Sequence, residues 1–172
     1  MHKLFAFSLL ASVFALAACD SSNVEDDFTV TAAVVGDAEL TTLEAAVGEA
    51  GLAGTLDDMD AEFTVFAPTD AAFTQALADL NLTPAQLLAD PTLGSILRLH
   101  VVADDELEAD DLDDGDTITT LNGQTLTVVV QGDRIGLDTE DADSMPNAFV
   151  ETADIEVSNG VVHKIDYVLL PN

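Results

Sequence analysis

The amino-acid sequence predicts an α+β domain, with helices concentrated in its first half and strands in its second. Glu62–Phe73 (EFTVFAPTDAAF) joins a strand of alternating β-branched and aromatic residues directly to a capped helix. Two turn signals of the β-hairpin kind, Asn122-Gly123 and Ser158-Asn159-Gly160, separate strand-like runs further along the chain. Strands that follow helices in this way are typical of α+β domains in which most strands pair antiparallel.

Residues 1–27 are expected to lie outside this domain. Residues 1–18 read as a signal peptide, because Lys3 precedes an apolar run, Leu4–Ala18, that is shorter than the ~20 residues a helix needs to span a bilayer. Leu16-Ala17-Ala18-Cys19 resembles the bacterial lipobox, which implies a lipid on Cys19 and leaves residues 19–27 as a lipidated cysteine with an acidic tether. An ordinary cleaved signal followed by a fortuitous cysteine is the alternative.

Composition and charge narrow the class of protein. Cys19 is the only cysteine, so no intrachain disulfide is possible and the core must stabilise the domain. The chain has 33 acidic residues against 4 Lys and Arg, a formal net charge of −29. This excludes nucleic acid as a partner, because phosphate binding needs clustered basic residues. An acidic excess of this size is a feature of halophile proteins, and we expect the chain to lose structure at low ionic strength, where the repulsion is unscreened.

The residues before the Glu62–Phe73 segment are expected to be helical. Phe28–Gly36 is predicted to form one or two helical turns, and Leu52–Leu56 a short helix. Between them, Thr41 is predicted to N-cap a helix that stops near Gly51.

Within the Glu62–Phe73 segment, Pro68 ends the strand and Thr69 is placed to N-cap the next helix. Asp70 puts a negative charge in the first turn of that helix, which favours it electrostatically. After Leu80, Thr83-Pro84 predicts one helix restart and Asp90-Pro91 a second, before the chain straightens into a strand over Leu99–Val102.

The C-terminal half is predicted to be rich in strands. The expected strands are Thr117–Leu121, Gln124–Val130, Arg134–Leu137, Ala148–Val150, Ala153–Val157 and Val161–Leu170.

Two segments carry a resemblance to a known family. Residues 63–73 (FTVFAPTDAAF) and 159–171 (NGVVHKIDYVLLP) resemble the two signature boxes of the fasciclin-like domain family. Leu87–Val102 is similar to the family's central segment, with Leu99-His100 where a Tyr-His pair usually stands. The resemblance implies one domain over residues 28–172, a compact β-sandwich or wedge with several short helices packed along one side. It also marks structural or binding candidates, namely Thr69, Asp70, Leu99, His100, Asn159, Gly160 and His163.

An enzyme, a metal site and a cofactor are not expected. Nine of the thirteen residues in Asp104–Asp116 are acidic, but Leu112 and Leu121 stand where an EF-hand loop needs oxygen donors. We therefore interpret this segment, like Asp138–Asp143, as a solvated acidic loop with Leu107 and Leu112 beneath the first; a loose Ca²⁺ or Mg²⁺ site is the alternative. After the signal only His100 and His163 could serve as catalytic histidines, and no G-x-S-x-G motif is present.

The predicted function is that of a membrane-anchored extracytoplasmic module for cell adhesion or cell-envelope interactions. Its expected location is the cell envelope, on the periplasmic face or the cell surface, as a monomer with a protein or polysaccharide partner. The alternative is a lipoprotein that binds a small ligand or polysaccharide. The composition weakens that alternative, because the chain has no Trp and a single Tyr, Tyr167, with which to stack on sugar rings.

Overall fold

The structure, a computed structural model, describes residues 28–103, 105–139 and 146–171. The signal peptide, Cys19 and the tether lie outside these described residues, as do residues 140–143 of the predicted acidic loop 138–143. The prediction is wrong for Asp138, which is the last residue of the strand Arg134–Asp138 and is fully buried. The helices are α1 (Val30–Gly36), α2 (Thr41–Glu49), α3 (Ala53–Leu56), α4 (Asp70–Leu80), α5 (Pro84–Leu88), α6 (Leu93–Leu99) and the 3₁₀ turn η1 (Ala109–Asp111). The strands are β1 (Phe63–Pro68), β2 (Val101–Ala103), β3 (Thr117–Thr119), β4 (Thr125–Gln131), β5 (Arg134–Asp138), β6 (Ala148–Val157) and β7 (Gly160–Ile165).

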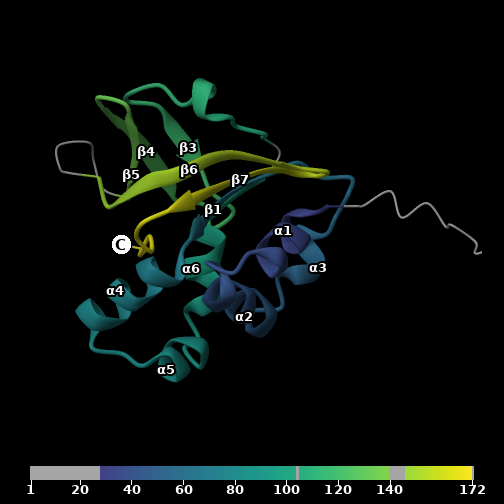
Figure 1. The fold of residues 1–172 in the computed structure, drawn as a ribbon, viewed down its shortest axis with the longest axis vertical. Coiled ribbons are helices and arrows are strands. Elements are labelled where there is room, and N and C mark those ends of the chain that lie inside the picture. The colour runs from purple at the N-terminus through teal and green to yellow at the C-terminus, as the bar shows by residue number, and fades with distance from the viewer. Residues whose placement is uncertain (1–27, 104, 140–145, 172) are drawn as a thin grey trace, which may run out of the picture.

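The strands form one sheet in the order β2-β1-β7-β6-β5-β4-β3, which curls until it nearly closes into a barrel. Figure 1 shows α1–α6 gathered on one side of this sheet and η1 at its other end. The predicted α+β fold with short helices along one side is therefore confirmed.

One neighbouring pair in the sheet, β1 with β7, is parallel, and every other pairing is antiparallel. Phe63 lies opposite Gly160, and the ladder runs to Pro68 opposite Ile165. All residues of both strands are buried. Strands buried on both faces are what parallel pairing requires, but turn signals in the sequence report only antiparallel neighbours, so this pair was not predicted.

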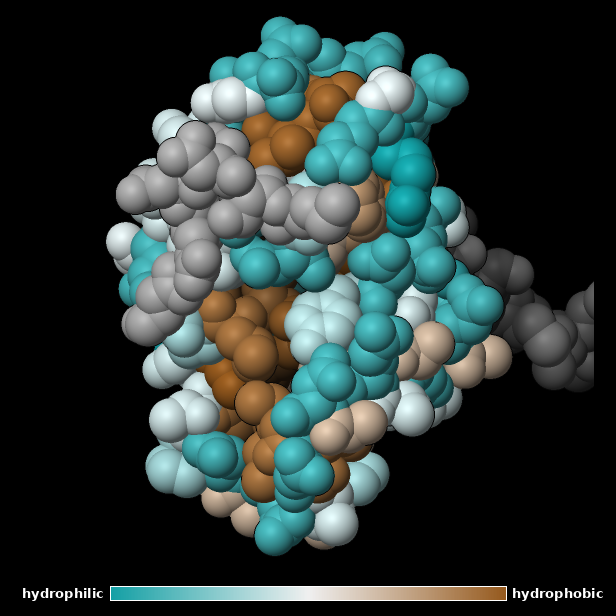
Figure 2. Space-filling model, turned by 90° about the vertical axis from the view of Figure 1, so that its left-hand side faces the viewer, coloured by the Kyte–Doolittle hydropathy of each residue, from teal (hydrophilic) through white to brown (hydrophobic). Residues whose placement is uncertain are grey.

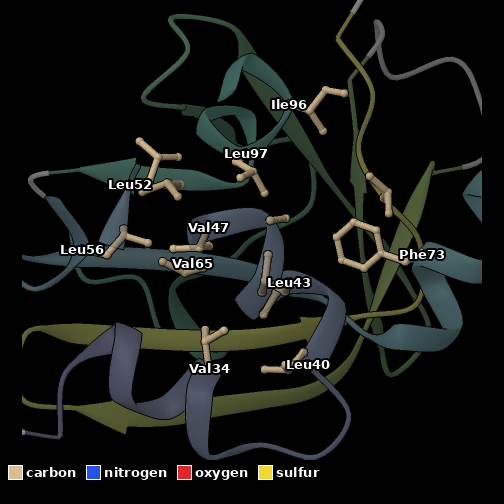
Figure 3. Packing of buried hydrophobic residues seen from close by; sticks show 14 of the residues in the cluster. Val34, Leu40, Leu43, Val47, Leu52, Leu56, Val65, Phe73, Ile96 and Leu97 are labelled. Atoms are coloured by element: carbon tan, nitrogen blue, oxygen red, sulfur yellow. The ribbon is translucent and has the colours of Figure 1, made fainter. Parts of the chain in front are cut away.

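Side chains that alternate along β1 divide the core in two. Phe63, Val65 and Ala67 face the helices, and Phe66 points into the barrel. Figure 3 shows the helical cluster, in which the apolar side chains of α2 and α6 lie around Val65. The barrel cluster is built around Phe66, Leu99, Leu126, Leu137 and Ile165, and includes Leu112 with Leu107 packed against it, as expected for the acidic segment.

Several local predictions are confirmed. The Thr69 side chain accepts a hydrogen bond from the Ala72 N–H at the start of α4. Thr83 caps α5, where Gln86 completes a capping box. Gly51 follows the end of α2 with φ +67°, and the Asn122-Gly123 turn joins β3 and β4 in an antiparallel hairpin.

The predicted N-cap of α2 is wrong. Leu40 occupies that position, and Thr41 is the first helical residue. The oxygen acceptor comes instead from α4, because the Asp70 carboxylate accepts hydrogen bonds from the Thr41 hydroxyl (2.6 Å) and the Thr42 N–H (2.8 Å). A tertiary contact thus replaces the local cap, which sequence spacing alone cannot reveal.

The predicted strand bounds also need correction in three places. The helix α6 continues to Leu99, so β2 begins only at Val101. The strand predicted over Val161–Leu170 ends at Ile165, since the chain then turns toward α6. The two strands predicted between residues 148 and 157 are one strand, β6, whose ladder is interrupted by irregularities beside Asp154, a residue with φ +56°.

We expect Gly160→Ala to unfold the domain or to lower its free energy of unfolding by at least ~3 kcal/mol. Gly160 has φ +142°, and a Cβ there would lie 1.8 Å from the Phe63 carbonyl oxygen. The control is Gly132→Ala in an open hairpin turn with φ +67°, which should cost only about 1 kcal/mol. Urea denaturation followed by circular dichroism measures both, and equal losses would contradict the steric argument.

Candidate functional site

The candidate residues from the family boxes do not form one surface site. Thr69, Leu99, His100, Asn159 and His163 are all buried, and they lie at separate places in the fold. Asp70 is at the start of α4 and Gly160 at the start of β7. Three of the buried polar residues act as anchors between segments that are distant in the sequence.

Asn159 joins the N-terminal helices to the sheet. Its side-chain oxygen accepts a hydrogen bond from the Val30 N–H at 2.9 Å. Its amide nitrogen donates to the carbonyl oxygens of Leu56 (2.8 Å) and Asp58 (3.1 Å). The Asn159 backbone carbonyl accepts from the Phe63 N–H, at the start of the parallel ladder. The side-chain oxygen and the amide nitrogen of Asn159 are therefore both used in hydrogen bonds that hold the fold together.

His100 anchors the C-terminal segment to α6. Its Nδ1 lies 2.7 Å from the Ile96 carbonyl oxygen, and its Nε2 lies 2.9 Å from the Leu169 nitrogen. The Leu169 N–H can only donate, so Nε2 is the acceptor and the proton of the neutral ring sits on Nδ1. Complete burial lowers the pKa of His100 to about 4, against the opposing effect of the Ile96 carbonyl. The ring is neutral at pH 7 and has no free nitrogen for a ligand.

His163 anchors the segment after β2 to the barrel. Its Nδ1 accepts from the Asp154 N–H at 3.2 Å, and its Nε2 donates to the Leu107 carbonyl oxygen at 2.8 Å. The ring also stacks on Phe66, with 5.6 Å between ring centroids. Burial lowers the pKa of His163 despite the Leu107 carbonyl and the Asp154 charge, so the nearby Asp154 carboxylate faces a neutral ring rather than an ion-pair partner.

Charged side chains tie α2, α4 and β7 together at the edge of the helical layer. Partial burial opposes ionisation of Asp70, but hydrogen bonds from Thr41 and Thr42 outweigh it and hold the pKa of its carboxyl below the usual value. Lys164 of β7 contacts Asp37 (2.5 Å) and Glu39 (2.9 Å). The hydrogen bond to Asp37 is the main reason that the pKa of Lys164 is raised and that of Asp37 is lowered. This cluster reads as a structural junction, in agreement with a capping role for Asp70.

A separate recess lies where the barrel fails to close. A groove of about 660 Å³ separates the edges of β2 and β3. The residues that line it include the acidic Asp105, Asp111 and Asp116 and the apolar Leu107 and Leu112. The groove was not predicted from the sequence, because the position of an open sheet edge depends on which strands pair. The sequence showed only that residues 104–116 are acidic.

The described part of the chain contains no group of side chains arranged as a metal-binding site. Within residues 28–103, 105–139 and 146–171, no three His, Cys, Asp or Glu side chains are grouped so that they could hold a metal ion. Within the same ranges no helix is both long and apolar enough to cross a bilayer.

Comparison with known proteins decides the family. The family model for the fasciclin domain matches residues 38–171. The chain belongs to the fasciclin domain family. The resemblance of the two signature boxes is thereby confirmed, and the boxes coincide with β1–α4 and with β7 and the segment after it, the parts of the fold that meet in the parallel ladder.

Similar proteins come from bacteria and animals. Uncharacterized protein sll1735 of Synechocystis is 36% identical over 136 residues, covering 79% of this chain and 92% of the relative. Immunogenic protein MPB70 of Mycobacterium bovis is 35% identical over 83% of this chain and 68% of its own. The transforming growth factor-beta-induced protein ig-h3 of the pig is 32% identical over 76% of this chain, which spans only 18% of that relative.

A solved structure shares the fold. A FAS1 domain pair from the insect cell adhesion molecule Fasciclin I superposes with a TM-score of 0.67 at 22% sequence identity. The match covers 83% of this chain and 50% of the insect chain.

We expect Asn159→Asp to lower the free energy of unfolding by about 2–4 kcal/mol, measured by urea denaturation at pH 7. The substitution replaces a buried donor by an acceptor that faces the Leu56 and Asp58 carbonyl oxygens. Asn147→Asp is the matched control, because exposed Asn147 uses its side-chain oxygen as an acceptor for Thr139, and it should change stability by less than about 0.5 kcal/mol. Similar losses in both variants would contradict the anchor role of Asn159.

We expect the stability of the domain to fall by about 2 kcal/mol between pH 7 and pH 5 through His100 alone. The folded-state pKa of about 4 lies below the unfolded value of 6.5, so the unfolded chain binds the proton first. This contribution is complete above pH 6.5 and is lost as the pH falls toward 4. Urea denaturation at several pH values, compared with His100→Gln, isolates the effect. Parallel pH profiles for the two proteins would overturn it.

Proposed function

We propose that this chain is a lipid-anchored extracytoplasmic module of the cell envelope that mediates adhesion or envelope interactions through its surface and performs no catalysis. The supporting observation is that His100, Asn159 and His163 are buried and hydrogen-bonded mainly to backbone groups. Polar residues engaged in this way stabilise the fold and offer nothing to a substrate. Function is therefore assigned to the outer surface.

The relatives support an interaction role. The insect protein whose domain pair shares this fold is a cell adhesion molecule. In Figure 2, hydrophilic residues form much of the face in view, and hydrophobic residues show as patches at its top and in its middle. Such a surface suits a module that stays soluble in its tethered state and meets its partner through polar contacts.

A small apolar ligand is the second candidate. A hollow of about 380 Å³ lies between α1 and the sheet, lined by Phe28, Ala33, Leu40, Ile155 and Val162 among others. Phe28 is 44% exposed, which offers one aromatic ring. A polysaccharide is a weaker candidate, because none of the described residues that line the larger groove between β2 and β3 is aromatic.

We expect Cys19→Ser to move the protein from the membrane fraction to the soluble fraction of cells that express it. The lipobox resemblance implies that Cys19 carries a diacylglyceryl group, and its two acyl chains are what stable anchoring requires. Replacement of a serine in the tether, Ser22→Ala, is the control and should leave the distribution between membrane and soluble fractions unchanged. A Cys19→Ser protein that still sediments with membranes would remove the anchor from the proposal.

We expect liposomes that carry the full chain to cluster with one another or with envelope fragments. Clustering is measured by light scattering from ~0.1 to 3 M salt, a range over which charge screening rises from partial to nearly complete. Circular dichroism at each salt concentration identifies where the domain is folded. Empty liposomes are the control. Liposomes that stay dispersed wherever the domain is folded would contradict adhesion and favour the small-ligand candidate.

A further inference from the structure

The edge of β3 that faces the groove has unpaired backbone groups. In an antiparallel ladder, residues that exchange hydrogen bonds with the neighbouring strand alternate with residues whose N–H and C=O point away from it. The Val128 N–H bonds to the Asp116 carbonyl and the Thr120 N–H to the Gln124 carbonyl, so positions 116, 118 and 120 face β4. Thr117 and Thr119 consequently direct their N–H and C=O groups into the groove, and no other described residue bonds to them there.

The edge of β2 repeats this arrangement from the other side. The Phe66 N–H bonds to the His100 carbonyl, so in the ladder with β1 it is Val102, opposite Thr64, that exchanges bonds. Val101 and Ala103 therefore point their backbone groups toward β3. Between described residues of the two segments, the Leu121 N–H bonds across the gap to the Val101 carbonyl at 2.7 Å. Beyond it the two edges diverge, and among the described residues no ladder joins them.

The groove between these edges has the dimensions and chemistry for one extended chain. Its wall runs along Thr117–Leu121, five residues, which corresponds to about 17 Å of strand. The partly exposed side chains of Leu107 and Leu121 supply apolar contacts on its walls, and Asp105, Asp111 and Asp116 supply negative charge. Leu112 and Ile118 also line it but lie mostly within the barrel core. No Lys or Arg lies among the lining residues.

We propose that this groove binds an extended, basic peptide segment of a partner protein, which adds as a strand to the free edges of β3 and β2. The backbone groups of Thr117, Thr119 and Ala103 supply main-chain hydrogen bonds, as in other cases of strand addition. The three aspartates select Lys and Arg at alternate positions, and small apolar residues fit between them. The inference rests on the proposed interaction function for the existence of such a partner.

A second copy of this chain is a poor occupant. Its 33 acidic residues face only 4 Lys and Arg, so an edge-to-edge pair of two copies would bring like charges together. Charged side chains along an open edge commonly prevent self-association in this way. The same charges attract a basic strand.

The test uses the full chain in detergent solution and the heptapeptide Lys-Val-Lys-Val-Lys-Val-Lys with a fluorescent label. A second peptide has the same sequence but carries N-methyl groups on alternate amides, which removes main-chain donors along one edge and keeps all charges. Binding is followed by fluorescence anisotropy, and hydrogen exchange of the Thr117 and Thr119 amides is followed by NMR. We expect binding of the first peptide, slower exchange at both amides, and at least tenfold weaker binding of the N-methylated peptide.

Two charge-matched double variants locate the site. Asp105→Asn with Asp111→Asn removes two groove carboxylates and should weaken binding about three- to tenfold, the size expected of two surface ion pairs. Glu49→Gln with Asp133→Asn removes two exposed charges elsewhere and should leave the affinity nearly unchanged. Equal weakening in both, or equal affinity for the two peptides, would show general electrostatic attraction and overturn the proposal.

The outcome is separable from that of the liposome experiment. Peptide binding at Thr117 and Thr119 without liposome clustering would support the strand site and reject adhesion. Clustering that persists unchanged with the Asp105→Asn, Asp111→Asn chain, combined with no peptide binding, would support adhesion and reject the strand site.

Discussion

The parallel pairing of β1 with β7 is the constraint on which the rest of the structure depends. It brings both family boxes into one ladder and requires the backbone of Phe63 to approach Gly160 so closely that no side chain fits there. The helical layer packs on one face of this pair and the barrel core on the other. A change in its register would expose one of these cores, because each one-residue slip turns every side chain to the opposite face.

Around this pair, the domain separates its charges from its interior. The acidic excess is carried mainly at the surface, and the buried polar side chains include Asn and two neutral His that bond to backbone groups. Burying an ionised group without a partner would cost far more than these neutral contacts. The fold therefore tolerates a net charge of −29 without repulsion inside its core. Two charged residues are the exceptions among the described residues: Lys164 is held between Asp37 and Glu39 at the margin of the core, and Asp138 is fully buried at the end of β5.

The sequence predicted what is decided by near neighbours. Thr69, Thr83 and the Asn122-Gly123 turn are local signals, and the structure confirms each of them. Errors arise where a distant group intervenes: Asp70 takes over the cap of α2, and β7 ends at Ile165 because the segment after it turns to meet His100. The anchoring contacts of His100, Asn159 and His163 could not be predicted, because they depend on partners that are distant in the sequence. The groove between β2 and β3 could not be predicted, because it is defined by a pairing that the sheet leaves unmade.

The anchor at Asn159 gives the domain a mechanical property. Phe28 accepts a hydrogen bond from the Ser158 N–H, and Val30 donates to Asn159, a residue 129 positions away. A pulling force applied at the N-terminal end of the domain therefore acts directly on the turn between β6 and β7, two inner strands of the sheet. The helix α1 cannot separate from the sheet without breaking its contacts to the turn between β6 and β7, the last two strands in the sequence. A domain pulled from this end would therefore load the β6–β7 turn before α1 separates from the sheet.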